Sequence, residues 1–386
     1  MKRFAILMAS FLSIAATASA QIGKSVTVSA GTPEDKALAD IYAAPDGPDK
    51  VALLDKFTAD FSSDGDMALL ADQLYVQTYL AQKNYAKVYE FGEKTLALDP
   101  SNLSAAVNMV HAAEEQADTK KLFSAGDKVA EIIAKYKNSP APEGMPPEQW
   151  SQQKSVSLNN VKGDLGYVQY ALVNAAYKTT DPVARAALFE RYVTTFPDSP
   201  YTPTVREQTA VAYQQAQDAP KMLDTAQRIL TTDPKNVSML ILLSDYWSEN
   251  NQQLDKAAAD AQLALDQLAQ AKKPDNLSDE QWQQQVAVEK GLAYSAIGEV
   301  NVDKGRNQPA VDAFRQASPL LKSNTVLYAR NLYRLGFTLA KMQRIPEART
   351  VLTEAVSINS PYKAKAQETL NKIGGPVSGK SAKKSS

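Results

Sequence analysis

Three short patterns in the sequence could carry chemistry, and the most specific lies near the C-terminus. Residues 374–381 read G-x-x-x-x-G-K-S, the pattern of a phosphate-binding loop in nucleotide hydrolases. Such a loop follows a strand and opens a helix, so that main-chain N–H groups converge on the phosphates. Here the pattern follows a predicted helix that ends near Ile373, and only five residues come after Ser381. We therefore interpret residues 374–386 as a disordered basic tail.

The other candidates for catalysis are one histidine and one Ser-x-x-Lys pair. His111 is the only histidine and there is no cysteine, which excludes a thiol nucleophile, a thiolate metal site and a pair of histidine ligands. Ser151 and Lys154 match S-x-x-K, but the companion S-D-N and K-T-G motifs are missing. Carboxylate pairs such as Glu114-Glu115 are interpreted as solvated helix faces. We predict a protein that is not an enzyme and uses no cofactor or metal.

The first twenty residues resemble a secretory leader. A basic pair, Lys2-Arg3, precedes an apolar run, and Ala18-Ser19-Ala20 forms a small-x-small cleavage site. We predict a signal peptide over residues 1–20, cleaved after Ala20, and a flexible segment over residues 21–32. No later segment is apolar for long enough to cross a bilayer. Because the chain lacks cysteine, its stability must come from packing, and we expect a periplasmic or secreted bacterial protein.

The charges of the chain are nearly balanced. Lys and Arg number 42 and Asp and Glu number 43, and without Lys2 and Arg3 the net charge is −3. This balance predicts neither nucleic acid nor an anionic membrane as the main partner.

The elements that would position any site are helices. Apart from the alternating stretch at residues 25–29, apolar residues recur at three- and four-residue spacing in segments of helical length. The fold class is therefore predicted as all-α. The segment over residues 71–102 reads as helix, turn at Lys83-Asn84, helix, and stop at Asp99-Pro100.

The chain also contains matching landmarks about 134 residues apart. The prolines of "LALDPSN" and "LTTDPKN", Pro100 and Pro234, differ by 134 residues, while Trp150 and Trp282 differ by 132. Gly166 and Gly298 also differ by 132. We interpret the common offset as an internal duplication of units at about 42–176 and 177–306, followed by hairpins over 307–373.

The helix–turn–helix over residues 71–102 resembles the tetratricopeptide repeat (TPR), a hairpin of 34 residues, as do two hairpins nearer the C-terminus. One matching hairpin has Tyr294, Ile297 and Gly298 on its first helix and Ala310, Phe314 and Ala317 on its second. Another carries Leu332, Leu335, Gly336 and Leu339, then Ala348, Leu352 and Ala355. The resemblance implies that residues 33–373 form a right-handed α-α superhelix of stacked hairpins. "FPDSPY" at residues 196–201 is similar to endings in periplasmic TPR proteins of cell-envelope assembly and division.

The resemblance also implies a function, because TPR proteins bind partners along the first helices of their hairpins. Register places eight candidate residues on this groove: Gln73, Gln77, Glu207, Gln214, Asp245, Glu299, Arg330 and Phe337. The Lys and Asn clamp for C-terminal carboxylates is not evident at these places. We expect a non-catalytic scaffold that binds a protein or peptide partner, in envelope assembly or maintenance. Peripheral envelope association, a glycan-binding or hydrolytic role, and a purely architectural oligomer stay open as alternatives.

Overall fold

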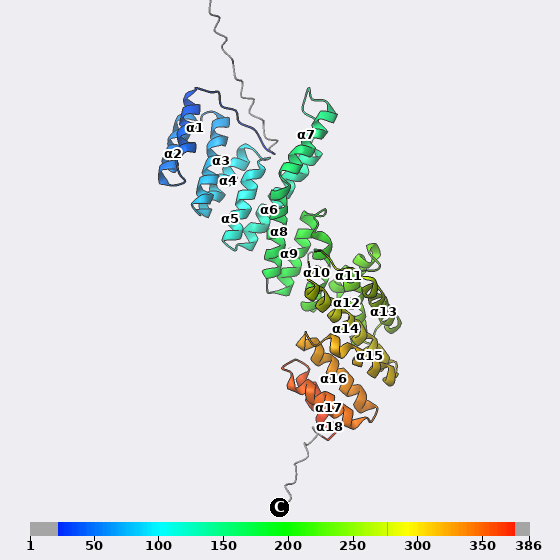
Figure 1. The fold of residues 1–386 in the computed structure, drawn as a ribbon. Coiled ribbons are helices and arrows are strands. Elements are labelled where there is room, and N and C mark those ends of the chain that lie inside the picture. The colour runs from blue at the N-terminus through cyan, green and yellow to red at the C-terminus, as the bar shows by residue number, and fades with distance from the viewer. Residues whose placement is uncertain (1–21, 276, 375–386) are drawn as a thin grey trace, which may run out of the picture. The chain divides into compact units, whose positions relative to one another are not determined.

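The computed structural model describes residues 22–275 and 277–374, and all regular elements in them are α-helices (Figure 1). The chain divides into two compact units, Met1–Val205 (unit 1) and Arg206–Ser386 (unit 2). The predicted leader, the tail from residue 375 onward and the pattern over residues 374–381, except Gly374, lie outside the described residues. The all-α prediction is confirmed for the described part of the chain.

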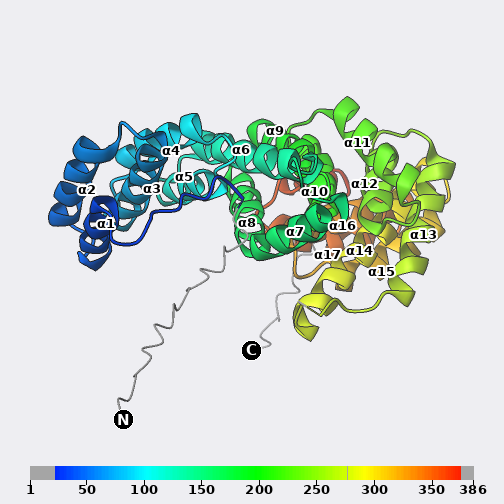
Figure 2. The same cartoon turned by 90° about the horizontal axis from the view of Figure 1, so that it is seen from above.

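The helices follow one another in hairpins whose partners are in contact along the chain (Figures 1 and 2). The helices that begin in unit 1 are α1 (Pro33–Ala43), α2 (Pro48–Phe61), α3 (Gly65–Ala81), α4 (Tyr85–Leu98), α5 (Leu103–Glu115), α6 (Thr119–Asn138), α7 (Pro147–Asn160), α8 (Lys162–Lys178), α9 (Pro182–Thr195) and α10 (Thr202–Gln215). Those of unit 2 are α11 (Ala219–Thr232), α12 (Val237–Glu249), α13 (Leu254–Gln270), α14 (Asp279–Asp303), α15 (Asn307–Leu320), α16 (Thr325–Lys341), α17 (Ile345–Ser357) and α18 (Lys363–Lys372).

Five hairpins share one tight turn between their two helices. In each, the residue before the second helix's N-cap is left-handed, and the N-cap N–H donates to the carbonyl five residues earlier, as Asn84 does to Tyr79 at 2.8 Å. The left-handed residues are Lys83, Ala117, Gln217, Gly305 and Gln343. The predicted turn at Lys83-Asn84 is therefore confirmed, and the shared turn explains the repeated helix–turn–helix spacing.

Small residues let the two helices of a hairpin pack closely. A Cβ atom on Gly298 of α14 would lie 2.5 Å from Cε1 of the buried Phe314 ring on α15. A Cβ atom on Gly336 of α16 would lie 2.6 Å from Cγ of Leu352 on α17. Both distances are far below van der Waals contact, so only glycine allows these ring and leucine positions. The close approach predicted from the TPR-like glycines is confirmed.

An extended segment over residues 22–32, here called the strap, precedes α1 and runs past α3 to the start of α5 (Figure 2). Ile22 is 1% exposed, and its carbonyl accepts from the Leu103 N–H at 3.3 Å. The N–H of Lys24 donates to Oδ2 of Asp99 at 2.8 Å, and Val26 and Val28 pack against the core of α1, α2 and α3. The sequence predicts a flexible segment over residues 21–32. The main-chain hydrogen bonds that anchor residues 22–24 leave no pattern in the sequence that could have indicated them.

Gly23 allows the strap to approach the loop before α5. Its φ is +129°, and a Cβ atom there would lie 3.0 Å from Oδ2 of Asp99 and 3.3 Å from Cα of Asn102. We expect Gly23→Ala to detach the strap, because an alanine at this φ is strained and its Cβ displaces the loop. The strain should weaken the attachment of the strap by about 1–2 kcal/mol. Hydrogen exchange at the Lys24 and Leu103 amides should accelerate by about tenfold.

The matched control for this prediction is Gly31→Ala. Gly31 also has a positive φ, +81°, but a Cβ atom added there would have no neighbour within 4 Å. Its replacement should change exchange only near the start of α1. Equal protection of Leu103 in the wild type and in Gly23→Ala would contradict the anchoring role.

None of the helices in the described part of the chain is long and apolar enough to cross a membrane.

Candidate functional site

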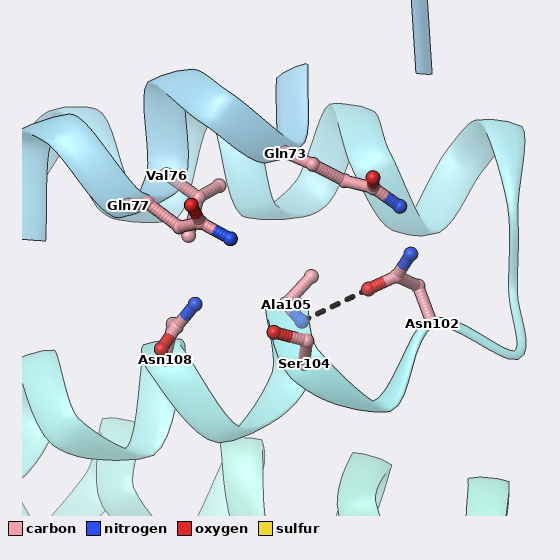
Figure 3. Close-up of a pocket in the computed structure, with 7 residues that line it drawn as sticks. All are labelled: Gln73, Val76, Gln77, Asn102, Ser104, Ala105 and Asn108. Atoms are coloured by element: carbon pink, nitrogen blue, oxygen red, sulfur yellow. Dashed lines mark hydrogen bonds between the residues drawn. The ribbon is translucent and has the colours of Figure 1, made fainter. Parts of the chain in front are cut away.

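Two candidate residues of the predicted groove, Gln73 and Gln77, lie together in unit 1. They project from α3 into a small hollow of about 30 Å³, whose other wall is the start of α5 (Figure 3). This amide hollow is lined by Gln73, Val76, Gln77, Asn102, Ser104, Ala105 and Asn108. Its lining carries amides and a hydroxyl but no charge, so it offers both donors and acceptors.

Most polar groups of the amide hollow are unused. Asn102 is committed, because it caps α5 by accepting from the Ala105 N–H at 3.0 Å and donates to Asp99 at 3.3 Å (Figure 3). The side chains of Gln73, Gln77, Ser104 and Asn108 form no hydrogen bond with the described residues. A hollow of this size cannot enclose a compact ligand, but it can receive single groups of an extended segment laid across it.

Three other candidates, Asp245, Glu299 and Arg330, meet in unit 2 in a very different setting. Arg330 of α16 binds Asp245 of α12 through both nitrogens, Nη1–Oδ2 at 2.8 Å and Nη2–Oδ1 at 2.9 Å. Its Nη1 also donates to Oε1 of Glu249 at 2.9 Å. Arg334, one turn further along α16, contacts Glu249 at 2.8 Å and Glu299 of α14 at 3.3 Å. We call these five residues the arginine network.

The arginine network is largely removed from solvent. Asp245, Arg330 and Arg334 are 7%, 6% and 8% exposed. Burial alone would lower the pKa of Arg330, but the Asp245 and Glu249 carboxylates raise it above its ordinary value. Burial raises the pKa of Glu299, while Arg334 opposes that shift. These candidate side chains are thus paired with one another, and the network joins α12, α14 and α16.

The remaining candidates are scattered. Glu207 of α10 is half-buried and accepts from Nδ2 of Asn236 at 2.7 Å. Gln214 is exposed on the same helix. Phe337 of α16 is 43% exposed, and its ring centroid lies 6.2 Å from that of Tyr333.

The sequence prediction left out polar residues of each cluster. Ser104 and Asn108 complete the amide hollow, while Glu249 and Arg334 complete the arginine network. In the arginine network each missed residue lies four positions from a predicted one on the same helix, Glu249 from Asp245 and Arg334 from Arg330. That i, i+4 spacing places both on one helix face and was a usable signal.

The residues that suggested catalysis are occupied with structural contacts. The His111 ring of α5 stacks on Tyr167 of α8 with centroids 4.1 Å apart, and burial lowers its pKa. The Lys154 ammonium donates to the carbonyls of Lys137 at 2.9 Å and Ser139 at 3.1 Å, so it is held by main-chain acceptors.

Asp72, beside Gln73 on α3, makes the stability of unit 1 depend on pH. Burial raises its pKa to about 6 from 3.8, with Lys94 opposing and Glu90 adding to the shift. The folded state therefore holds this proton more tightly than the unfolded chain, and stability falls as pH rises from about 4 to about 6. We expect Asp72→Asn to stabilise unit 1 by about 1–2 kcal/mol at pH 7.5 but not at pH 4.

Urea unfolding at the two pH values, followed by Trp150 fluorescence, checks the Asp72 prediction, because Trp150 is the only tryptophan of unit 1. Asp40→Asn, at an exposed position of α1, controls for the change in net charge. The same gain at both pH values would contradict the assigned cause.

Comparisons with known proteins find a likeness of structure alone. No family model matches the sequence, and no curated protein matches it. In the Cut9–Hcn1 hetero-tetramer of APC/C, the match has 13% identity and a TM-score of 0.43, and covers 88% of this chain and 62% of the other. The match to yeast Tom70 has 13% identity and a TM-score of 0.36, and covers 92% of this chain and 68% of the other. The match to the P58(IPK) TPR domain has 11% identity and a TM-score of 0.30, and covers 89% of this chain and 99% of the other.

The chain thus spans less than two thirds of the Cut9–Hcn1 chain that it matches. All three TM-scores are below 0.5, and the hairpin assignment here rests on the helices, turns and glycine contacts described above. On those features the chain is an all-α protein of stacked helical hairpins that resembles TPR solenoids.

Proposed function

We propose that this protein is a non-catalytic scaffold that binds an extended, neutral polar segment of a protein partner at the amide hollow. One observation carries the proposal. Four side chains on two adjacent first helices, Gln73, Gln77, Ser104 and Asn108, face a common hollow without partners among the described residues.

The chemistry of the hollow selects the kind of ligand. Side-chain amides can donate to and accept from the main chain of an extended peptide, whose own N–H and C=O groups need partners once water is displaced. The lining carries no charged side chain that could pair with a charged ligand. We infer further that the protein acts outside the cytoplasm, in envelope assembly or maintenance; the leader-like residues 1–20 and "FPDSPY" support this inference.

A displayed library of random twelve-residue peptides, selected on the full chain, tests the proposal. We expect enriched peptides to be polar and poor in charge, and Asn108→Arg to weaken their binding by at least about tenfold, since the arginine fills the hollow and adds a charge. Gln227→Arg, at an exposed position of α11 in unit 2, is the matched control and should leave binding unchanged.

Photocrosslinking then locates the bound peptide. A photoreactive residue at Gln77 should crosslink to a selected peptide, whereas one at Lys94 on α4 should not. Enriched peptides that bind Asn108→Arg as tightly as the wild type, or crosslink equally from both positions, would overturn the proposed site.

A further inference from the structure

Two loops of the chain are built in the same way. The first loop, residues 99–102 (Asp-Pro-Ser-Asn), precedes α5, and the second loop, residues 233–236 (Asp-Pro-Lys-Asn), precedes α12. In both, the aspartate accepts from the amide of the loop's third residue, at 3.0 Å and 3.4 Å. In both, the asparagine donates to that aspartate, at 3.3 Å and 3.2 Å, and caps the following helix.

The first loop holds an extended segment of the chain, the strap. The loop's Asp99 accepts from Lys24 N–H, and the N–H of Leu103, at the first position of α5, donates to the Ile22 carbonyl. These two hydrogen bonds hold the main chain on either side of Gly23. A side chain at position 23 would contact Asp99 and Asn102. Asp99, Asn102 and Leu103 are accordingly 5%, 1% and 4% exposed.

The second loop has the same donor and acceptor, but no described residue covers them. Asp233 is exposed, and Asn236 and Val237 are only half-buried. The N–H of Val237, at the first position of α12, makes no hydrogen bond to a described residue. An N–H at this position has no partner inside its own helix, so it stays available to a ligand.

The surroundings of the second loop favour a basic ligand. Glu207 lies within hydrogen-bond distance of Asn236, and its charge contributes to raising the pKa of Glu289, after the larger effect of burial. Three carboxylates, Glu207, Asp233 and Glu289, thus lie in or near the second loop, whose one basic residue is Lys235. An extended segment that binds the second loop as the strap binds the first must carry glycine at the position of Gly23. A lysine directly after that glycine would be attracted by the three carboxylates.

The chain contains a second segment of this kind. Gly-Lys occurs in the sequence only at 23–24 and 379–380, each time followed by serine, and the tail adds Lys383 and Lys384 without any acidic side chain. We propose that the second loop binds the Gly379-Lys380-Ser381 segment of a second copy of the chain, as the first loop binds Gly23-Lys24-Ser25. The proposal is independent of the amide hollow and gives the phosphate-loop-like pattern a role as a docking segment.

A second copy, rather than the same one, follows from the distances along unit 2. Five residues from Gly374 to Gly379 reach at most about 18 Å. Alternate helices of a hairpin stack run in the same sense, and Tyr362, at the start of α18, senses the charge of Glu249 at the end of α12. The second loop precedes α12 and Gly374 follows α18, so they lie at opposite ends of two helices that are about 20 Å and 15 Å long. Together these lengths exceed the reach of about 18 Å from Gly374 to Gly379, so the segment must come from a second copy.

The test is sedimentation velocity on the full chain, over a range of concentrations. Two variants each remove one side of the contact: Gly379→Val adds a side chain where the strap tolerates none, and Val237→Pro removes the free N–H at a position where helices accept proline. Each should weaken self-association by at least about tenfold, the effect of losing one buried hydrogen bond and its fit. Thr325→Pro, at the first position of asparagine-capped α16, is the matched control and should associate like the wild type.

Mixing the two variants distinguishes a contact between copies from a general loss of folding. Each variant keeps the half that the other lacks, so the mixture should associate more strongly than either variant alone. Three results would overturn the proposal: a full chain that stays monomeric, association unchanged by either substitution, or a mixture no better than its components.

Discussion

Replacing Arg330 with methionine should lower the free energy of unfolding of unit 2 by about 3–5 kcal/mol. The substitution keeps much of the side chain's apolar volume but leaves Asp245 buried, at 7% exposure, without its two hydrogen bonds from the guanidinium. A carboxylate in that position must either stay charged with only Arg334 nearby, at 4.0 Å, or take up a proton, and both are costly. Fluorescence of the buried Trp247 on α12 during urea unfolding, with Trp150 and Trp282 replaced by phenylalanine, measures the loss.

The pair can be removed as well as broken. Asp245→Leu combined with Arg330→Met should recover most of the lost stability, because two apolar side chains need no partners. Arg228→Met breaks the exposed pair with Asp224 on α11 and should change stability by less than about 1 kcal/mol. If Arg330→Met were no worse than Arg228→Met, the arginine network would not hold α12, α14 and α16 together.

The second large effect is expected at Gly298. Gly298→Val should destabilise unit 2 by about 3 kcal/mol, since its Cβ would lie 2.5 Å from a ring carbon of fully buried Phe314. The ring cannot retreat without moving α15, so the cost is one of overpacking. The midpoint of urea unfolding, again followed by Trp247, reports the change.

Gly166 provides the matched control for Gly298, as its counterpart in the predicted duplication. Nothing lies within 4 Å of the position of its Cβ, so Gly166→Val should stay within about 0.5 kcal/mol of the wild type. Combining Gly298→Val with Phe314→Leu should cost less than the sum of the two single changes, because the smaller side chain makes room. Strict additivity would show that valine acts on α14 alone.

Much of the fold could be predicted from the sequence, because helix periodicity and turn residues are local. The stop at Asp99-Pro100 and the glycine of close packing, Gly298, each leave a mark within one or two turns of helix. The duplication and the superhelical handedness are larger-scale statements and stay predictions.

The candidate site was less accessible to prediction, because its character depends on which side chains find partners across hairpins. Asp245 and Arg330 are 85 residues apart and look like solvated groove residues when each is considered alone. Arg334, which completes the network, donates to the hydroxyl of the small, buried Ser295 of α14 at 3.1 Å. Gln73 and Gln77 differ because neither side chain hydrogen-bonds to any of the described residues.

The strap also bears on how unit 1 comes apart. In a stack where each hairpin touches only its neighbours, the terminal hairpin is the first to fray. The contact between Lys24 and Asp99 joins residues 75 positions apart and ties the segment before α1 to the loop before α5. Opening the first hairpin therefore also pulls on the loop before the third hairpin, so the N-terminal end opens as one cooperative block. A proteolytic cut within the strap would release that block and let unit 1 unravel hairpin by hairpin.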